Sequence, residues 1–245
     1  MQSEIIGNAL MTNTLSSPQL VVALDVPRRA DALTMARTLK GTAPWCKVGM
    51  EMFTHAGPAF LEDLVGMGYK VFLDLKFYDI PNTVGQAVKS AAGVGVDMLT
   101  LHCQGGERMC RTACDAVAGL NGKKPLLFGV TVLTSFAQGE MPGIRENTSD
   151  FALALARGAQ NWGLDGVVCS GHEVAGIKAA CPGFSCLCPG IRPSGSVADG
   201  QRRTMTPAQA VAAGADYLVV GRPIIAASDP RAAAQQILAD MASAT

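Results

Sequence analysis

The 245-residue chain lacks several features that would each point to a class of protein. Lysine and arginine total 20, as do aspartate and glutamate, so the formal net charge is zero. A neutral chain without basic tracts offers no electrostatic reason to bind nucleic acid or an anionic membrane. No apolar run approaches the about 20 residues that a membrane-spanning helix requires. We therefore expect a protein that binds neither nucleic acid nor a membrane.

Residues 1–17 contain no basic segment followed by a long apolar core, which a secretory signal would have. We expect a frayed N-terminal extension there, followed by one catalytic domain over residues 18–245. The chain has eight cysteines, and without an export signal we interpret them as reduced, packed thiols of a cytoplasmic protein. Cys186 and Cys188 would share a strand face, yet no second ligand pair or nearby histidine completes a zinc site.

Short apolar strands alternate with helical segments along the whole chain. Continuous apolar strands of this kind are typical of a parallel sheet covered by helices. Eight strand–helix units and a length close to about 250 residues favour a single closed (β/α)8 TIM barrel, with an open doubly wound sheet as the alternative. The expected strands are residues 20–25, 45–50, 70–76, 97–102, 125–133, 166–169, 185–188 and 217–220. The expected helices are residues 29–39, 56–67, 83–92, a segment ending at 118, 149–162, 173–180, 207–213 and 231–242.

Polar residues end most of these strands on the same side. In a TIM barrel the carboxyl ends of the strands converge on one mouth, where the active site lies. The long connections 134–148 and 189–206 fall on that face as well. The residues at or just after the strand ends are Asp25, Asp74, Lys76, His102, Thr134, Arg192, Gly221 and Arg222, and Lys47 lies within the second strand.

The run from Asp74 to Thr83 is the richest in chemistry. Side chains alternate along a strand, so Asp74 and Lys76 point the same way, and Asp79 lies just beyond the strand. An Asp-x-Lys pair alone is a solvated salt bridge of little energetic value about as often as it is part of a functional site. Opposite charges gathered where a strand becomes a loop are otherwise expensive unless a site needs them.

Gly221 and Arg222 follow the last strand, where phosphate sites of such barrels are commonly built. Glycine allows close approach of the backbone, and the planar guanidinium suits two phosphate oxygens. This position favours a phosphorylated substrate.

The sequence Asp74-Leu-Lys-Phe-Tyr-Asp-Ile-Pro-Asn-Thr83 resembles the active-site signature of the orotidine 5'-monophosphate decarboxylases, in particular those of bacteria. Further motifs similar to that family are Leu24-Asp25, Lys47-Val48-Gly49, 130–135, 189–193, 201–207 and 219–224. The resemblance implies a TIM barrel that converts orotidine 5'-monophosphate to uridine 5'-monophosphate, the last step of de novo pyrimidine nucleotide synthesis. It implies no metal and no organic cofactor.

The resemblance also implies roles for individual residues. Lys76 would stabilise the charge that develops at C6 of the pyrimidine and protonate it, within a catalytic network with Asp74, Lys47 and Asp79. The chain would form a homodimer in which Asp79, Ile80 and Thr83 reach the partner's site. His102 is given no settled role. The substrate-binding residues would be Asp25, Lys47, Ile80, Thr83, Thr134, Arg192, Gln201, Gly221 and Arg222.

Two other functions stay open from the sequence. One is a Mg²⁺-dependent sugar-phosphate lyase or isomerase on the same barrel, for which Glu51 would be a candidate extra ligand, because Mg²⁺ takes oxygen ligands. The other is a non-catalytic nucleotide sensor or scaffold, against which the intact Asp74, Lys76 and Asp79 argue.

Overall fold

The computed structural model describes residues 17–141, 143–193 and 203–244. The expectation for residues 1–16 and the proposed role of Gln201 lie outside these described residues. Within them, no helix is both long and apolar enough to cross a membrane.

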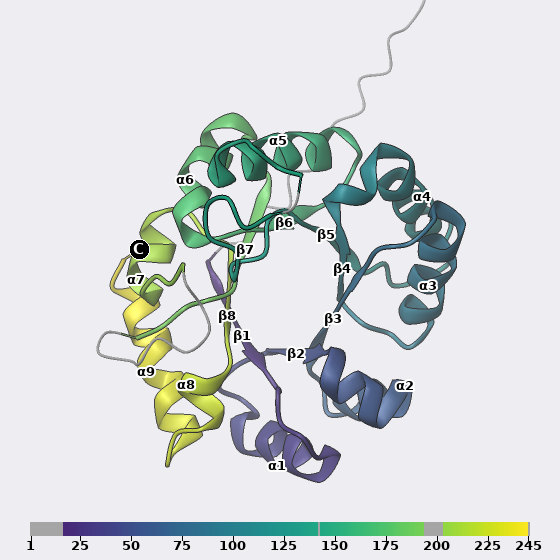
Figure 1. Cartoon of the computed structure of the whole chain (residues 1–245). Helices are drawn as coiled ribbons and strands as arrows, with labels where there is room; N and C mark the ends of the chain where they lie inside the picture. The colour runs from purple at the N-terminus through teal and green to yellow at the C-terminus, as the bar shows by residue number, and fades with distance from the viewer. Residues whose placement is uncertain (1–16, 142, 194–202, 245) are drawn as a thin grey trace, which may run out of the picture.

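Eight parallel strands close into a barrel, with each strand paired to its neighbours in sequence and β1 paired to β8. The closed sheet is visible end-on at the centre of Figure 1, and the helices surround it. The predicted (β/α)8 TIM barrel is confirmed, and the open sheet is excluded. The strands are β1 (Gln19–Ala23), β2 (Trp45–Gly49), β3 (Lys70–Phe77), β4 (Met98–His102), β5 (Leu126–Val130), β6 (Gly166–Val168), β7 (Ser185–Cys188) and β8 (Tyr217–Val220).

Helices follow the strands and cover the outside of the barrel. The long connections predicted after the fifth and seventh strands are present, and the described part of the second one pairs its own ends through a bridge between Ile191 and Met205. The helices are α1 (Arg29–Leu39), α2 (Met50–Gly66), α3 (Pro81–Gly93), α4 (Gly106–Ala118), α5 (Thr148–Asn161), α6 (Gly171–Ala180), α7 (Pro207–Ala212), α8 (Arg222–Ile225) and α9 (Pro230–Ala242), with a 3-10 turn η1 (Cys103–Gly105) before α4.

Several element boundaries differ from those predicted, and one helix was missed. Helix α2 begins at Met50, directly after β2, and not near Ala56. A kink at Gly57, whose φ is 63°, separates its first turns from the part that was predicted, because Gly57 and Pro58 interrupt helical periodicity. Strand β1 ends at Ala23, so Asp25 belongs to the connection that follows. The four-residue helix α8 was not predicted as an element.

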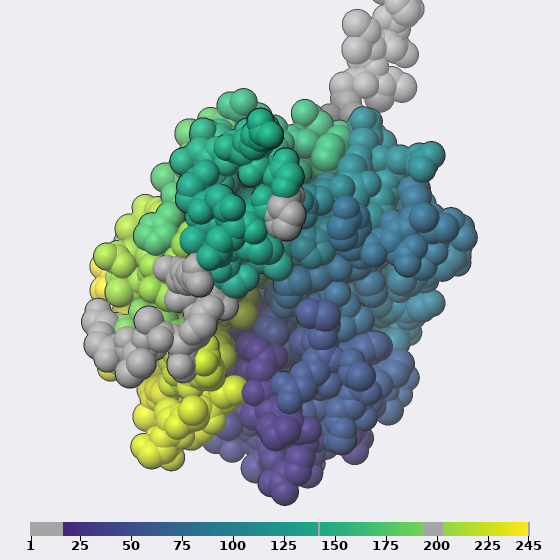
Figure 2. Space-filling model, viewed as in Figure 1, coloured from purple at the N-terminus to yellow at the C-terminus, as the bar shows by residue number. Residues whose placement is uncertain are grey.

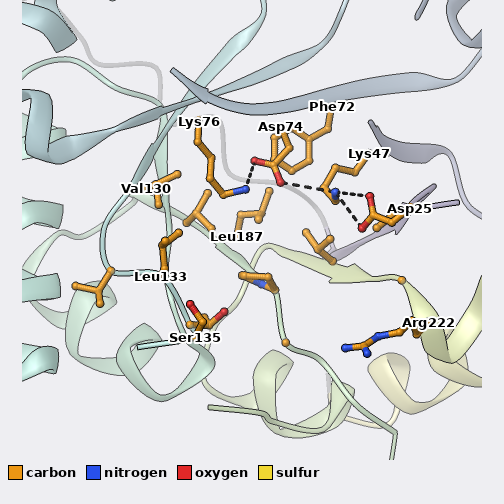
Figure 3. Close-up of a pocket in the computed structure, with 18 of the residues that line it drawn as sticks. Asp25, Lys47, Phe72, Asp74, Lys76, Val130, Leu133, Ser135, Leu187 and Arg222 are labelled. Carbon is orange, nitrogen blue, oxygen red and sulfur yellow. Dashed lines mark hydrogen bonds and ion pairs between the residues drawn. The ribbon is translucent and has the colours of Figure 1, made fainter. Parts of the chain in front are cut away.

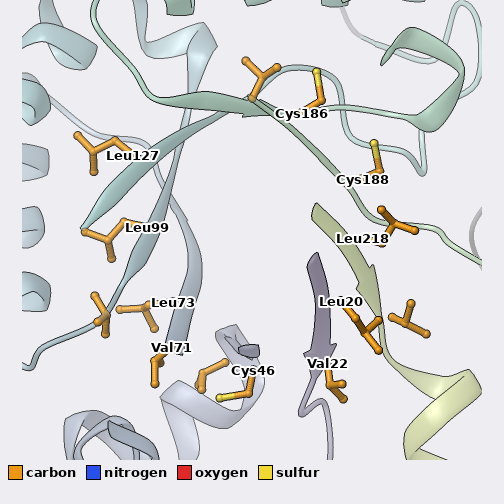
Figure 4. Packing of buried hydrophobic residues seen from close by; sticks show 14 of the residues in the cluster. Leu20, Val22, Cys46, Val71, Leu73, Leu99, Leu127, Cys186, Cys188 and Leu218 are labelled. Atoms are coloured by element: carbon orange, nitrogen blue, oxygen red, sulfur yellow. The ribbon is translucent and has the colours of Figure 1, made fainter. Parts of the chain in front are cut away.

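The core has two layers, as expected for strands buried on both faces. The outer layer packs strand side chains such as Leu20, Val71 and Leu127 against the helices (Figure 4). Cys186 and Cys188 both belong to this layer, so the predicted shared face is confirmed. All eight cysteines are free thiols.

The inner layer fills the barrel, and its lower end is closed by aromatic rings. Trp45 and Phe128 each meet Tyr217 edge to face, with ring centroids 5.5 and 5.6 Å apart. Such geometry is favourable for aromatic quadrupoles. The aromatic floor, defined here as Trp45, Phe128 and Tyr217, is buried and closes this end of the barrel. The cavity of the barrel lies at the other end. Figure 2 shows the surface of this face, with the chain coloured as in Figure 1.

Candidate active site

Four charged side chains at the ends of the first three strands form a continuous alternating network (Figure 3). Lys47 Nζ lies 3.0 Å from Asp25 Oδ1 and 3.7 Å from Asp74 Oδ2. Lys76 Nζ donates to Asp74 Oδ1 at 2.9 Å. The predicted convergence of Lys47, Asp74 and Lys76 is confirmed, and within one chain Asp25 provides the fourth charge.

The strand register explains why these groups meet. Lys47 pairs with Phe72, and Gly49 pairs with Asp74, in the ladder between β2 and β3. Side chains alternate along a strand, so Lys47 and Asp74 both point into the barrel mouth. Gly49 leaves room for them, because a Cβ there would lie 2.9 Å from Lys47 Nζ and 3.0 Å from Asp25 Oδ1.

Lys76 reaches the network through an irregularity of its strand. It has φ of 53°, in the left-handed region, and is the one residue other than glycine with positive φ among those the structure describes. The pairing of β3 with β4 shifts register between Leu73 and Phe77. A strained residue of this kind costs about 1–3 kcal/mol and persists where its surroundings fix it, most often at functional sites.

The network keeps Asp74 ionised although its side chain is only 13% exposed. Burial by itself would raise the pKa of Asp74, and the charges of Lys47 and Lys76 oppose it. Hydrogen bonds from Lys76 and Thr100 act in the same direction, so the pKa of Asp74 lies below its ordinary value. Opposite charges in alternation thus hold a buried carboxylate and two ammonium groups in one site.

The network forms one wall of a cavity of about 400 Å³ at the mouth of the barrel, which is a usual size for a small-molecule site. The opposite wall is apolar and includes Val130, Leu133, Val168 and Leu187. One side of a flat ring could therefore rest on hydrocarbon while its edge faces the lysines. Ser135 also lines this cavity, and sequence reasoning assigned it no role.

The far end of the cavity carries the predicted phosphate-binding residues. Gly221, Arg222 and Arg192 all line the cavity, as does Thr134, and Figure 3 shows Arg222 well away from Lys76. The guanidinium group of Arg222 provides positive charge that a phosphate requires at this end. A ligand with an anionic tail would thus bind with its other end at the Lys76–Asp74 pair.

Arg203 anchors the C-terminal end of the connection between β7 and α7. Its Nη1 pairs with Glu173 of α6, and its Nη2 donates to the Leu133 carbonyl at 3.3 Å. Glu173 is buried, and its carboxylate also accepts from the Ser170 amide at 2.9 Å. Burial raises the pKa of Glu173, although Arg203 opposes this. The pair ties three segments of the barrel mouth together.

Asp79, Ile80 and Thr83 do not line the cavity of their own chain. They lie past the end of β3 and are exposed, and Asp79 Oδ1 accepts from the Ile80 amide at 2.6 Å. The prediction that they act in a partner's site is compatible with this placement and remains a prediction.

His102 lies at the end of β4, beside the network, with its ring centroid 5.6 Å from that of Tyr78. Burial lowers the pKa of His102, and the charge of Lys76 lowers it further, while Asp74 acts in the opposite direction. The imidazole is therefore neutral near pH 7.

A divalent metal fits this donor set poorly. Asp25 and Asp74, the acidic side chains that line the cavity, are already paired with the ammonium group of Lys47. Glu51, the extra ligand that a magnesium enzyme would want, is exposed and is not among the residues that line the cavity. In the described part of the chain, no three residues among histidine, cysteine, aspartate and glutamate are grouped to hold a metal.

Comparison with known proteins gives one consistent result. A family model described as "Orotidine 5'-phosphate decarboxylase / HUMPS family" matches residues 18–237. A protein of Nitratidesulfovibrio vulgaris (strain DP4) named orotidine 5'-phosphate decarboxylase is 56% identical over 230 residues, which cover 92% of this chain and 98% of that protein. A protein of the same name from Pseudomonas aeruginosa (strain LESB58) is 48% identical and covers 91% and 97%. The crystal structure of orotidine 5'-phosphate decarboxylase from Lactobacillus acidophilus is similar with a TM-score of 0.81 at 36% identity, covering 92% of this chain and 99% of that one.

Proposed function

The chain belongs to the orotidine 5'-phosphate decarboxylase / HUMPS family, and from this premise we propose how its network of two aspartates and two lysines performs the reaction. The enzyme is a carboxy-lyase that converts orotidine 5'-monophosphate to uridine 5'-monophosphate and CO2. The observation that carries the mechanism is the Lys76–Asp74 ion pair, fixed at 2.9 Å and facing an apolar wall across the cavity.

The chemical step breaks the bond between C6 of the pyrimidine and its carboxylate. The carboxylate leaves as CO2, and the electron pair of the broken bond stays on C6, where little delocalisation is available. The ammonium group of Lys76 stabilises this charge and then transfers a proton to C6, which completes the product. Lys76 regains its proton from solvent. No step in this sequence calls for a metal or an organic cofactor.

Asp74 serves the reaction in two ways. It aims Lys76, because its carboxylate accepts a hydrogen bond from the ammonium group at 2.9 Å. It also places negative charge near the substrate carboxylate, which disfavours the ground state while the charge that moves to C6 approaches Lys76. Lys47 bridges Asp74 and Asp25, and through Asp25 it connects the network to the ribose hydroxyl groups.

The phosphate group binds at the other end of the cavity, to Gly221 and Arg222 with Arg192. Gln201 belongs to the same proposal, and Thr134 and the apolar wall hold the base. Binding energy gained at a group remote from C6 can be used for positioning at the reacting carbon.

The proposed assembly is a homodimer with shared sites. The large hydrophobic side chains that are exposed in the described residues all follow the neighbouring strands β2 and β3, namely Met50, Tyr78 and Ile80, with Ile80 66% exposed. Ile80 stands between Asp79 and Thr83, so burying this surface against a second copy would carry all three toward the partner's cavity. A cytoplasmic location belongs to the same proposal.

Turnover of orotidine 5'-monophosphate, followed by ultraviolet absorbance, tests the function. Wild-type protein should convert the nucleotide with and without EDTA, and Lys76→Ala should be inactive while still binding uridine 5'-monophosphate. Activity abolished by EDTA would instead support the magnesium-dependent sugar-phosphate enzyme. Binding without turnover by the wild type would support a nucleotide sensor.

Mixing two inactive variants tests the shared site. Lys76→Ala and Asp79→Ala chains should regain activity when their subunits exchange, because a mixed dimer contains one site with both native residues. No recovery, with exchange verified by mass spectrometry, would refute the assignment of Asp79 to the partner's cavity.

A further inference from the structure

Thr100, in the middle of β4, connects to the network but belongs to no motif that the sequence marked as functional. Thr100 is 0% exposed. Its hydroxyl lies 3.0 Å from the backbone nitrogen of Lys76 and 2.9 Å from Asp74 Oδ1. One buried hydroxyl thus contacts the two residues that perform the chemical step.

The direction of both hydrogen bonds is fixed by the partners. A backbone N–H can only donate, so the Thr100 oxygen accepts from Lys76. An ionised carboxylate can only accept, so the single hydroxyl proton goes to Asp74. Asp74 Oδ1 consequently receives one hydrogen bond from Thr100 and another from Lys76 Nζ, and the carboxylate cannot rotate without losing both.

The contact also explains how Lys76 keeps its unusual backbone. The β3–β4 ladder shifts register between Leu73 and Phe77, and in this interval the Thr100 oxygen provides the acceptor for the Lys76 amide. A buried amide left without an acceptor costs about 1–3 kcal/mol. The left-handed conformation of Lys76, with φ of 53°, is therefore held by a side chain of the next strand.

We propose that Thr100 is a positioning residue of the decarboxylation, which sets the backbone of Lys76 and the orientation of Asp74 through one hydroxyl group. This inference rests on the proposed roles of Lys76 and Asp74. Thr100 itself touches neither substrate nor reacting atoms, since it does not line the cavity. Its effect therefore falls on the chemical step more than on substrate binding.

Thr100→Val is the decisive variant, because it keeps the shape of the side chain and removes the hydroxyl. A displacement of about 1 Å in a catalytic group can lower a rate about 10²-fold, so we expect kcat to fall about 10- to 100-fold. The KM and the affinity for uridine 5'-monophosphate should stay within about 3-fold, because the phosphate end of the cavity is unchanged. Thr100→Ser keeps the hydroxyl and should recover most of the lost rate.

Thr131 provides a matched control. It is also a buried threonine of the barrel, and its hydroxyl donates to the Val168 carbonyl at 2.9 Å, away from the network. Thr131→Val should lose a similar amount of stability in urea unfolding and keep kcat within about 2-fold, because its hydroxyl holds no catalytic group.

The pH profile of kcat separates positioning from a general loss of stability. Asp74 is faced by Lys47 from β2, by Lys76 from its own strand, and by Thr100 and His102 from β4. Removing the donor at Thr100 leaves the carboxylate easier to protonate, so the acid limb of the profile should move to higher pH in Thr100→Val and stay in place in Thr131→Val. Repeating the profiles in a His102→Gln background removes the titration of the imidazole.

The outcomes are distinct. If wild-type protein does not turn over orotidine 5'-monophosphate, the proposed function fails before Thr100 is in question. If the wild type is active and folded Thr100→Val matches Thr131→Val in kcat and in its acid limb, the positioning role is refuted. A drop in kcat that Thr100→Ser does not recover would also refute it.

Discussion

Replacing Gly49 by alanine should lower activity without lowering stability. The backbone at Gly49 has φ of −91° and ψ of −179°, which any residue adopts, so the substitution introduces no backbone strain. At such compatible positions Gly→Ala typically stabilises a protein by about 0.4–1 kcal/mol, because the unfolded chain has fewer conformations. The substitution should therefore act on the ion pair between Lys47 and Asp25, which lies beside Gly49.

The new methyl group would lie 2.9 Å from Lys47 Nζ and 3.0 Å from Asp25 Oδ1. Favourable contact begins at about 3.5 Å, so these two atoms must retreat by roughly 0.5–1 Å. The Lys47 ammonium group can move cheaply, since it ends a flexible side chain, but moving it alters its 3.7 Å contact with Asp74. Errors of this size in catalytic groups lower rates by up to about 10²-fold, and we expect kcat/KM to fall about 10- to 100-fold.

The assay compares Gly49→Ala with Gly66→Ala. Gly66 is the last residue of α2, is exposed, and has no heavy atom within 4 Å of its would-be Cβ. Gly66→Ala should leave kcat/KM unchanged. Both variants should unfold within about 2–4 °C of the wild type, the shift that 1 kcal/mol produces in a domain of this size. A Gly49→Ala enzyme with wild-type kcat/KM would refute the reasoning, as would one that loses its fold.

Two further predictions concern stability. Because the pKa of Asp74 is lowered in the folded protein, its ionised form stabilises the fold above the unfolded-state value of about 3.9. This contribution is lost as the pH falls through the folded-state value, so the difference in unfolding free energy between wild type and Asp74→Asn, measured in urea, should shrink below about pH 4; a difference that does not vary with pH would contradict this. The second prediction is that Glu173→Ala lowers the free energy of unfolding by about 3–5 kcal/mol, because it leaves the guanidinium of Arg203 without its carboxylate. Adding Arg203→Met should recover part of that loss. Strictly additive effects in this double-mutant cycle would show that the pair is not coupled.

The barrel was predictable because its signal is repeated eight times. Strands buried on both faces are continuously apolar, and each is followed by a helix, so errors at single boundaries do not alter the topology. The start of α2 was missed because Gly57 and Pro58 have the composition of a helix boundary, whereas the helix continues across a kink there. Glycine and proline in a sequence do not determine whether a helix ends there or continues across a kink because of its packing.

The charged network was predictable in part. Asp74 and Lys76 share a strand face, and the pairing of β2 with β3 places Lys47 beside them. Thr100 gave no signal, because a threonine within an apolar strand is fully explained by its preference for sheets. The left-handed backbone of Lys76 was equally hidden, since it arises from a register shift against β4 and not from the residue itself. The roles of Asp79, Ile80 and Thr83 depend on a second chain, and the exposure of all three residues agrees with such roles.

The aromatic floor of Trp45, Phe128 and Tyr217 makes the barrel a blind chamber. The nucleotide and CO2 must then use the same opening at the other end of the barrel. The same partition lets the two ends of the molecule change independently. Substitutions on the N-terminal side of the aromatic floor can change thermal stability, while those on the side of the cavity change which ligand binds.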